Sequence, residues 1–194
     1  VELLKDAPPV DKLNEDIAGT LNPQGFRVIR GTKTTYCDIW LCKNWDAKPD
    51  FEPPPNILYP FQAGQLIGVA RFARKGADFR DQDISSGVYT IRYGQQPVDG
   101  AHVGTSPTRD FLLLIRAEDE KNAEPTGNDD LIERSSAAAE SSHPCLLSMQ
   151  RKAAETCPSM RHNDETDWWI LALQGTAGGK PLPIEFVISG VAAE

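Results

Sequence analysis

The sequence lacks a hydrophobic run long enough to cross a lipid bilayer, which takes about 18 apolar residues. Its longest uninterrupted apolar run covers only the six residues 168–173. The sequence also lacks a surplus of positive charge, since 20 lysines and arginines stand against 28 aspartates and glutamates. Nucleic acids and anionic membrane surfaces recruit basic patches. We therefore expect no membrane span and no nucleic acid among the partners.

The sequence contains none of the short motifs that mark the common enzyme classes. No phosphate-binding glycine loop, dinucleotide fingerprint or Gly-x-Ser-x-Gly elbow occurs. Cysteines and histidines do not form the closely spaced pairs of zinc sites. No pair of carboxylates for glycoside hydrolysis can be singled out among the 28 acidic residues. The sequence therefore predicts a protein that is not an enzyme and needs no cofactor.

Cysteines are few but even in number: Cys37, Cys42, Cys145 and Cys157. An even count is typical of an oxidising compartment, and the first residue, Val1, is consistent with a removed signal peptide. We expect a periplasmic or extracellular location and a disulfide between Cys145 and Cys157. The pairing of Cys37 with Cys42 stays open, because five positions of straight strand span about 16 Å and a bridge needs Cα atoms within about 7 Å.

Short runs of β-branched and aromatic residues, separated by turn residues, are abundant. Residues 88–93 alternate between two faces, whereas residues 111–115 are apolar throughout, as in a strand covered on both faces. Further runs cover residues 26–29, 34–41, 66–72, 145–149, 168–174 and 184–190. This pattern predicts an all-β fold, an antiparallel β-sandwich of about eight strands with one or two short helices and an extended N-terminal arm.

Residues 1–25 form the predicted arm, and residues 26–194 form a single β-sandwich domain. Within the arm, Val10, Leu13, Ile17 and Leu21 have the spacing of one apolar stripe on a short helix. That stripe packs either on its own domain or on another subunit. A second short helix is expected to begin at Asn128, whose side chain can cap it.

Residues 43–64 contain five prolines and four aromatic residues. Proline removes ladder hydrogen bonds, so this segment should run extended over the surface. Its aromatic side chains pack either on the protein's own sheet or on a partner. Trp45, Phe51 and Tyr59 are therefore candidate binding residues.

The loop that follows residue 93 is longer than most hairpin connections, and such loops are often functional. It offers Asp99, His102 and Arg109 as candidate binding residues. The loop contains the residue types of a Ser/His/Asp catalytic set, with Ser106 as the serine. However, Ser106 precedes a proline in a turn-like setting rather than a nucleophile elbow, so we favour binding over catalysis.

Trp168 and Trp169 are adjacent in a predicted strand, so their side chains point to opposite faces. Both are candidate binding residues. An exposed indole can stack on a sugar ring or bury itself in a protein interface.

Residues 143–162 gather soft metal ligands, namely His143, Cys157, Met160 and His162. Thiolate, thioether and imidazole are the ligands of blue copper sites. The order Cys, Met, His departs from the Cys, His, Met order of cupredoxins. We therefore expect no metal site and keep these residues as weak candidates.

The segments GVYTIRYGQQPVDGAHVGTSPTRDFLLL, HPCLLSM and IEFVISG resemble a family of secreted bacterial β-sandwich proteins that has no assigned function. The resemblance covers residues 26–190. It implies an exported, β-rich domain and transfers no catalytic or binding residue.

The leading hypothesis is a non-enzymatic, extracytoplasmic accessory subunit that binds other protein subunits. Its place would be the periplasmic face of a membrane-embedded complex, for example an energy-conversion complex. One alternative is a carbohydrate- or small-ligand-binding module. A second alternative is a cupredoxin-like copper protein.

Overall fold

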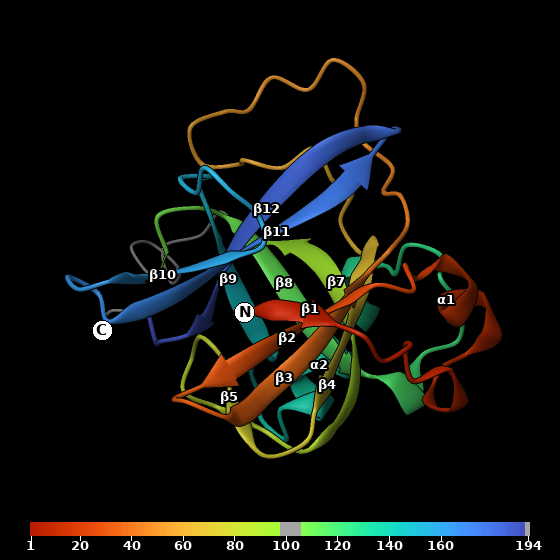
Figure 1. The fold of residues 1–194 in the computed structure, drawn as a ribbon. Coiled ribbons are helices and arrows are strands. Elements are labelled where there is room, and N and C mark those ends of the chain that lie inside the picture. The colour runs from red at the N-terminus through yellow and green to blue at the C-terminus, as the bar shows by residue number, and fades with distance from the viewer. Residues whose placement is uncertain (98–105, 193–194) are drawn as a thin grey trace.

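The computed structural model describes residues 1–97 and 106–192 (Figure 1). Within these residues, ten strands form one antiparallel sheet in the order β1-β2-β3-β4-β7-β8-β9-β12-β11-β10. The strands are β1 (Glu2–Leu4), β2 (Gly25–Arg30), β3 (Thr34–Leu41), β4 (Leu66–Phe72), β7 (Gly87–Gln95), β8 (Asp110–Arg116), β9 (Leu146–Gln150), β10 (Ser159–Asn163), β11 (Trp168–Ala177) and β12 (Lys180–Ser189). The short strands β5 (Gly76–Ala77) and β6 (Asp83–Ile84) pair separately. The α-helices are α1 (Glu15–Thr20) and α2 (Asn128–Ala138).

The sheet curls into a half-barrel whose two sides share one inner core. One side consists of β1, β2, β3, β4, β7 and β8, and the other of β12, β11 and β10 (Figure 1). The five-residue strand β9 joins them, because it pairs with β8 along one edge and with β12 along the other. The all-β prediction with few helices is confirmed. The sheet has ten strands, more than the eight or so expected. They form one continuous curled sheet because β9 pairs with both sides.

Strand alternation decides which residues face the inner core. In β8, Leu112 and Leu114 point inward, while Phe111, Leu113 and Ile115 belong to a second, outer cluster. Helix α2 packs over this outer face of β8. The prediction that residues 111–115 form a strand covered on both faces is thus confirmed.

The N-terminal arm packs on its own domain. Ile17 and Leu21 are buried in the inner core, and Leu13 is half-buried against it. Val10 lies in a separate 3₁₀ turn and is 57% exposed. The four apolar residues therefore do not share one helix. The side chain of Asn14 caps α1 by accepting a hydrogen bond from the backbone N–H of Asp16 (2.9 Å).

The buried aromatic side chains of residues 43–64, a segment that we name the strap, pack in the inner core of their own sheet. The indole of Trp45 donates to the Ile67 carbonyl on β4 (2.8 Å). Its backbone N–H donates to the Thr176 carbonyl on β11 (2.7 Å). Trp45, Tyr59 and Phe61 are all buried, and the last two stack with ring centroids 5.8 Å apart. The strap thus joins the two sides of the half-barrel at one end.

The expected disulfide is absent, because Cys37, Cys42, Cys145 and Cys157 are all free thiols. Cys145 is buried directly before β9, whereas Cys157 is half-buried in the segment between β9 and β10. Cys37 lies within β3 and Cys42 beyond its end, and the chain does not turn back between them. Burial raises the pKa of Cys42 to about 11 and raises the pKa values of Cys37 and Cys145 further.

Helix α2 lies where the second short helix was expected, but Asn128 is its first helical residue and not its cap. Its N-cap is Gly127, and no side chain accepts a hydrogen bond there. Asp129 and Asp130 in its first turn complement the helix dipole. No helix in residues 1–97 or 106–192 is long and apolar enough to span a membrane.

Candidate binding sites

The two ends of the sheet approach each other without pairing and leave a cavity that we name the seam groove. Its volume is about 480 Å³. Among the described residues, no backbone pairing joins β1 or β2 to β10 or β11. The groove is lined by Val1, Val28, Ile29, Arg30, Gly31, Tyr36, Met160, Trp169, Ile188 and Ser189.

The register of β10 on β11 determines which side chains form the aromatic wall of this groove. Met160 pairs with Leu171, a residue of the inner core, and His162 pairs with Trp169, two positions further along both strands. Met160, His162 and Trp169 therefore all point to the concave side, with Trp169 beyond the packed core. Trp169 is 47% exposed, while its neighbour Trp168 faces the outer cluster and is only 7% exposed.

His162 supports Trp169 from one side, with the two ring centroids 4.6 Å apart. Its Nδ1 lies 2.7 Å from a carboxylate oxygen of Asp164, and its Nε2 lies 2.9 Å from one of Asp167. The hydrogen bond to Asp167, followed by the one to Asp164, raises the pKa of His162 above its usual value. Both ring nitrogens of His162 are thus held by exposed carboxylates, which favour the imidazolium form over the neutral ring.

The opposite wall carries a free cation over an apolar floor. Val28 and Ile188 are buried at the base of the groove, and Arg30 is exposed at its rim. Arg30 forms no ion pair with any residue in the described ranges. The groove can thus hold apolar or planar groups on its floor and against Trp169, and an anionic group beside Arg30.

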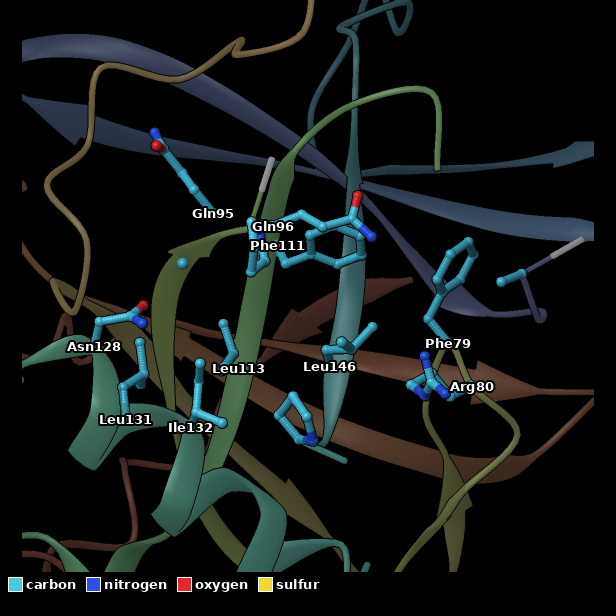
Figure 2. Close-up of a pocket in the computed structure, with 14 residues that line it drawn as sticks. Phe79, Arg80, Gln95, Gln96, Phe111, Leu113, Asn128, Leu131, Ile132 and Leu146 are labelled. Carbon is cyan, nitrogen blue, oxygen red and sulfur yellow. The ribbon is translucent and has the colours of Figure 1, made fainter. Parts of the chain in front are cut away.

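A second cavity, which we name the outer slot, lies on the convex face of the sheet (Figure 2). It has a volume of about 80 Å³. Phe111, Leu113 and Leu146 form its floor, α2 forms one wall and the turn that carries Phe79 forms the other, as Figure 2 shows. Its polar lining residues are Arg80, Gln95, Gln96 and Asn128.

Buried hydrogen bonds fix the Phe79 wall. The carboxylate of Asp78 accepts the backbone N–H groups of Arg80 (2.8 Å), Gln82 (2.8 Å) and Leu146 (3.1 Å). The backbone N–H of Phe79 donates to the Leu146 carbonyl (2.8 Å). This wall therefore has a defined position relative to β9.

A buried ion-pair network fixes the helix wall. Glu120 accepts hydrogen bonds from Arg92 on β7 (Nε, 2.6 Å) and from Arg134 on α2 (Nη1, 3.1 Å). The Arg92 side chain is fully buried and also donates to the carbonyls of Gly64 and Asn122. Because α2 is tied to β7 by charge, the width of the slot is set by the fold.

The long loop contributes no catalytic arrangement in its described part. Asp99 and His102 lie outside the described residues. The hydroxyl of Ser106 lies 2.7 Å from that of Ser148, and the Arg109 guanidinium donates to the Gln96 carbonyl (2.9 Å). The first contact anchors the loop to β9, and the second joins the two ends of the loop.

Asp110, at the start of β8, has a structural role. Its buried carboxylate accepts the hydroxyl of Tyr93 (2.5 Å) and the backbone N–H of Leu58 in the strap (2.8 Å). Burial raises the pKa of Asp110 despite these hydrogen bonds. Asp110 thus ties the strap to the central strands.

The predicted partner residues of the strap are mostly inaccessible. Trp45 and Tyr59 are buried among the protein's own side chains, and Phe51 is half-buried. The Tyr59 hydroxyl donates to the Gln150 carbonyl (2.8 Å) and accepts the N–H of Glu185 (2.9 Å). Of the predicted aromatic binding residues, Trp169 is the one that presents a broad exposed face.

The weak metal candidates do not converge. His143 precedes β9, whereas Cys157, Met160 and His162 follow it. No group of three or more His, Cys, Asp or Glu side chains within residues 1–97 and 106–192 is placed to hold a metal ion. Sequence reasoning did not single out Arg30, because an arginine beside a turn carries no pattern, and it assigned Arg80 to a solvated loop of mixed charge.

Comparison with known proteins adds no information on these sites. No family model, no curated protein and no solved structure matches this chain.

Proposed function

We propose that this protein is a non-enzymatic interaction module that takes an extended segment of a partner polypeptide into the seam groove. The observation that carries the proposal is the pair of sheet edges that border an apolar cavity without pairing. A peptide in extended conformation satisfies such edges with its backbone and fills the groove with alternate side chains. The predicted extracytoplasmic location and a partner within a membrane-embedded complex belong to the same proposal.

The lining of the groove determines which side chains the bound segment should carry. Val28, Ile188 and Trp169 match apolar side chains at alternate positions, and Arg30 matches a carboxylate near one end of the segment. β2 extends beyond β1, since β1 pairs only with residues 25–27. Residues 28–30 of β2 therefore offer backbone groups on the groove side.

A library of displayed random dodecapeptides, selected on the folded protein, tests the proposal. We expect selected peptides to alternate apolar residues and to lose at least about tenfold in affinity against Trp169→Ala. Val10→Ala is the matched control, since Val10 is exposed on the arm and does not line the groove. This control should bind as the wild type does.

Amide hydrogen exchange separates strand addition from simple pocket binding. Added peptide should slow exchange at the free edge of β10, in residues 159–163, and at residues 28–30 of β2. Peptides that bind Trp169→Ala as tightly as the wild type, or that leave exchange at both edges unchanged, would overturn the proposal.

A second candidate function is binding of a sugar ring on Trp169. The observation in its favour is a 47% exposed indole with the carboxylates of Asp164 and Asp167 close by. Titration with oligosaccharides, followed by tryptophan fluorescence, tests it. Sugar binding should vanish in Trp169→Ala and leave the exchange of β10 unchanged. No fluorescence change with any oligosaccharide at millimolar concentration would remove this candidate.

A further inference from the structure

The outer slot is a preformed apolar cavity whose walls are both held by buried polar contacts. Phe111, Leu113 and Leu146 supply the floor, and Leu131 and Ile132 of α2 face Phe79 across it (Figure 2). Because Asp78 fixes one wall and Glu120 fixes the other, the slot does not depend on an occupant to stay open.

Gly94 on β7 contributes to the depth of the slot. A Cβ atom at this position would lie 2.4 Å from a methyl carbon of Leu113. The glycine therefore lets the Leu113 side chain lie close against β7, which leaves the space above it free. A larger residue at position 94 would push Leu113 into the slot.

The size of the slot limits what can enter. Its volume is about 80 Å³, whereas a cavity of roughly 150 Å³ is needed to hold benzene. On that scale the slot accepts an aliphatic group of about three or four carbons. A branched group of this size matches the branched side chains that line the slot.

The positively charged side chain of Arg80 lies beside the slot and is exposed to solvent. Arg80 follows Phe79 directly, is exposed and lines the slot. Its backbone N–H is bound by Asp78, but its guanidinium forms no ion pair with any residue in the described part of the chain. A guanidinium at the mouth of an apolar cavity binds a carboxylate through paired, charge-assisted hydrogen bonds.

We propose that the outer slot binds a short, branched aliphatic carboxylate, with the alkyl group on Leu113 and the carboxylate on Arg80. This inference is independent of the seam groove, which lies on the other face of the sheet. The ligand is a small free acid of the isovalerate type.

Titration of ¹⁵N-labelled protein with isovalerate and with its neutral isostere isovaleramide tests the proposal. Amide shifts should change around Phe79, Leu113 and Leu146, and isovalerate should bind at least about tenfold more tightly than isovaleramide. Octanoate, whose chain exceeds the slot, should bind no more tightly than isovalerate.

Three variants make the result specific. In Arg80→Gln the preference for isovalerate over isovaleramide should fall to near unity, while the amide spectrum stays that of a folded protein, because Arg80 is exposed. Arg74→Gln removes another exposed arginine that does not line the slot and should keep the preference. Ile132→Phe should fill the slot and abolish binding of both compounds.

Several results would overturn the proposal. These are equal affinity for acid and amide, an unchanged preference in Arg80→Gln, tighter binding of octanoate, or no shift around the slot at millimolar isovalerate.

Discussion

The seam groove and the outer slot lie on opposite faces of one sheet and are kept open in different ways. The groove exists because β1 and β10 end the sheet without meeting, so it lies between two ends of the sheet that do not pair. The slot exists because buried carboxylates hold a turn and a helix at a fixed distance. The groove can therefore change by pairing with a new strand, whereas the fold determines the size of the slot.

Removing the charge behind the slot should have the largest effect. Glu120→Ala leaves the fully buried guanidinium of Arg92 without its partner, which costs about 3–5 kcal/mol of unfolding free energy. Urea unfolding measures this loss. As a control, Asp130→Ala removes an exposed partner of Arg134 and should cost less than about 1 kcal/mol. Equal losses in the two variants would show that the network does not hold α2.

Crowding the strap should have the next largest effect. A Cβ at Gly175 would lie 2.0 Å from the Trp45 ring, so Gly175→Ala should lower the unfolding free energy by about 1–3 kcal/mol. The same substitution at Gly19, in α1, meets nothing within 4 Å and should raise stability by up to about 1 kcal/mol. Thermal unfolding measures the change in stability of each variant. A Gly175→Ala variant more stable than the wild type would contradict the packing of Trp45.

Asp110 should impose a pH dependence on the strap that runs against the usual acid denaturation. Burial raises its folded pKa above the unfolded value of about 3.9. Its contribution to stability is therefore fully present below the unfolded pKa and falls as pH rises through the folded pKa. Asp110→Asn cannot titrate, so its stability relative to wild type should improve as pH rises. Urea unfolding over acid to neutral pH checks this, and a constant difference would contradict the raised pKa.

The smallest effect concerns the wall of the seam groove. The carboxylates of Asp167 and Asp164 raise the pKa of His162 above about 6.5. NMR titration of the imidazole signals should show this, and Asp167→Asn should lower the pKa of His162 more than Asp164→Asn does. The groove would then differ from the slot in having a titratable imidazole packed against one of its lining residues, Trp169. Identical effects of the two substitutions would show that the hydrogen bonds are equivalent.

Local features of the fold could be predicted from the sequence because they depend on near neighbours. The alternation of residues 88–93, the two-sided burial of residues 111–115 and the opposite directions of Trp168 and Trp169 all follow from strand geometry. The helix that starts at residue 128 follows from its acidic first turn and the polar residues around it.

Features that depend on edges and distant contacts could not be predicted. Periodicity shows which face of β9 is apolar but not that both its edges are paired, so the two sides looked like separate layers. The expected Cys145–Cys157 bridge failed because its plausibility rested on loop length, not on the strand between the two residues. β10 went unnoticed because its residues, SMRHN, are polar and its pattern belongs to an open edge.

Strand alternation predicted that Trp168 and Trp169 face opposite sides, but it did not predict which residues surround the Trp169 indole. Met160 and His162 were considered only as metal ligands, whereas the register of β10 on β11 makes them neighbours of the indole. A binding role for Arg30 or Arg80 can be inferred only from the cavities that these side chains line.

The contact between Trp45 and β11 has a consequence for biosynthesis. Its backbone partner, Thr176, lies far from Trp45 in the sequence, so all the residues between them must be synthesised before this contact can form. Such distant pairing slows folding and leaves apolar surface open in the nascent chain. Chaperone dependence during translation, lost once the β11–β12 hairpin emerges, is the behaviour this architecture implies.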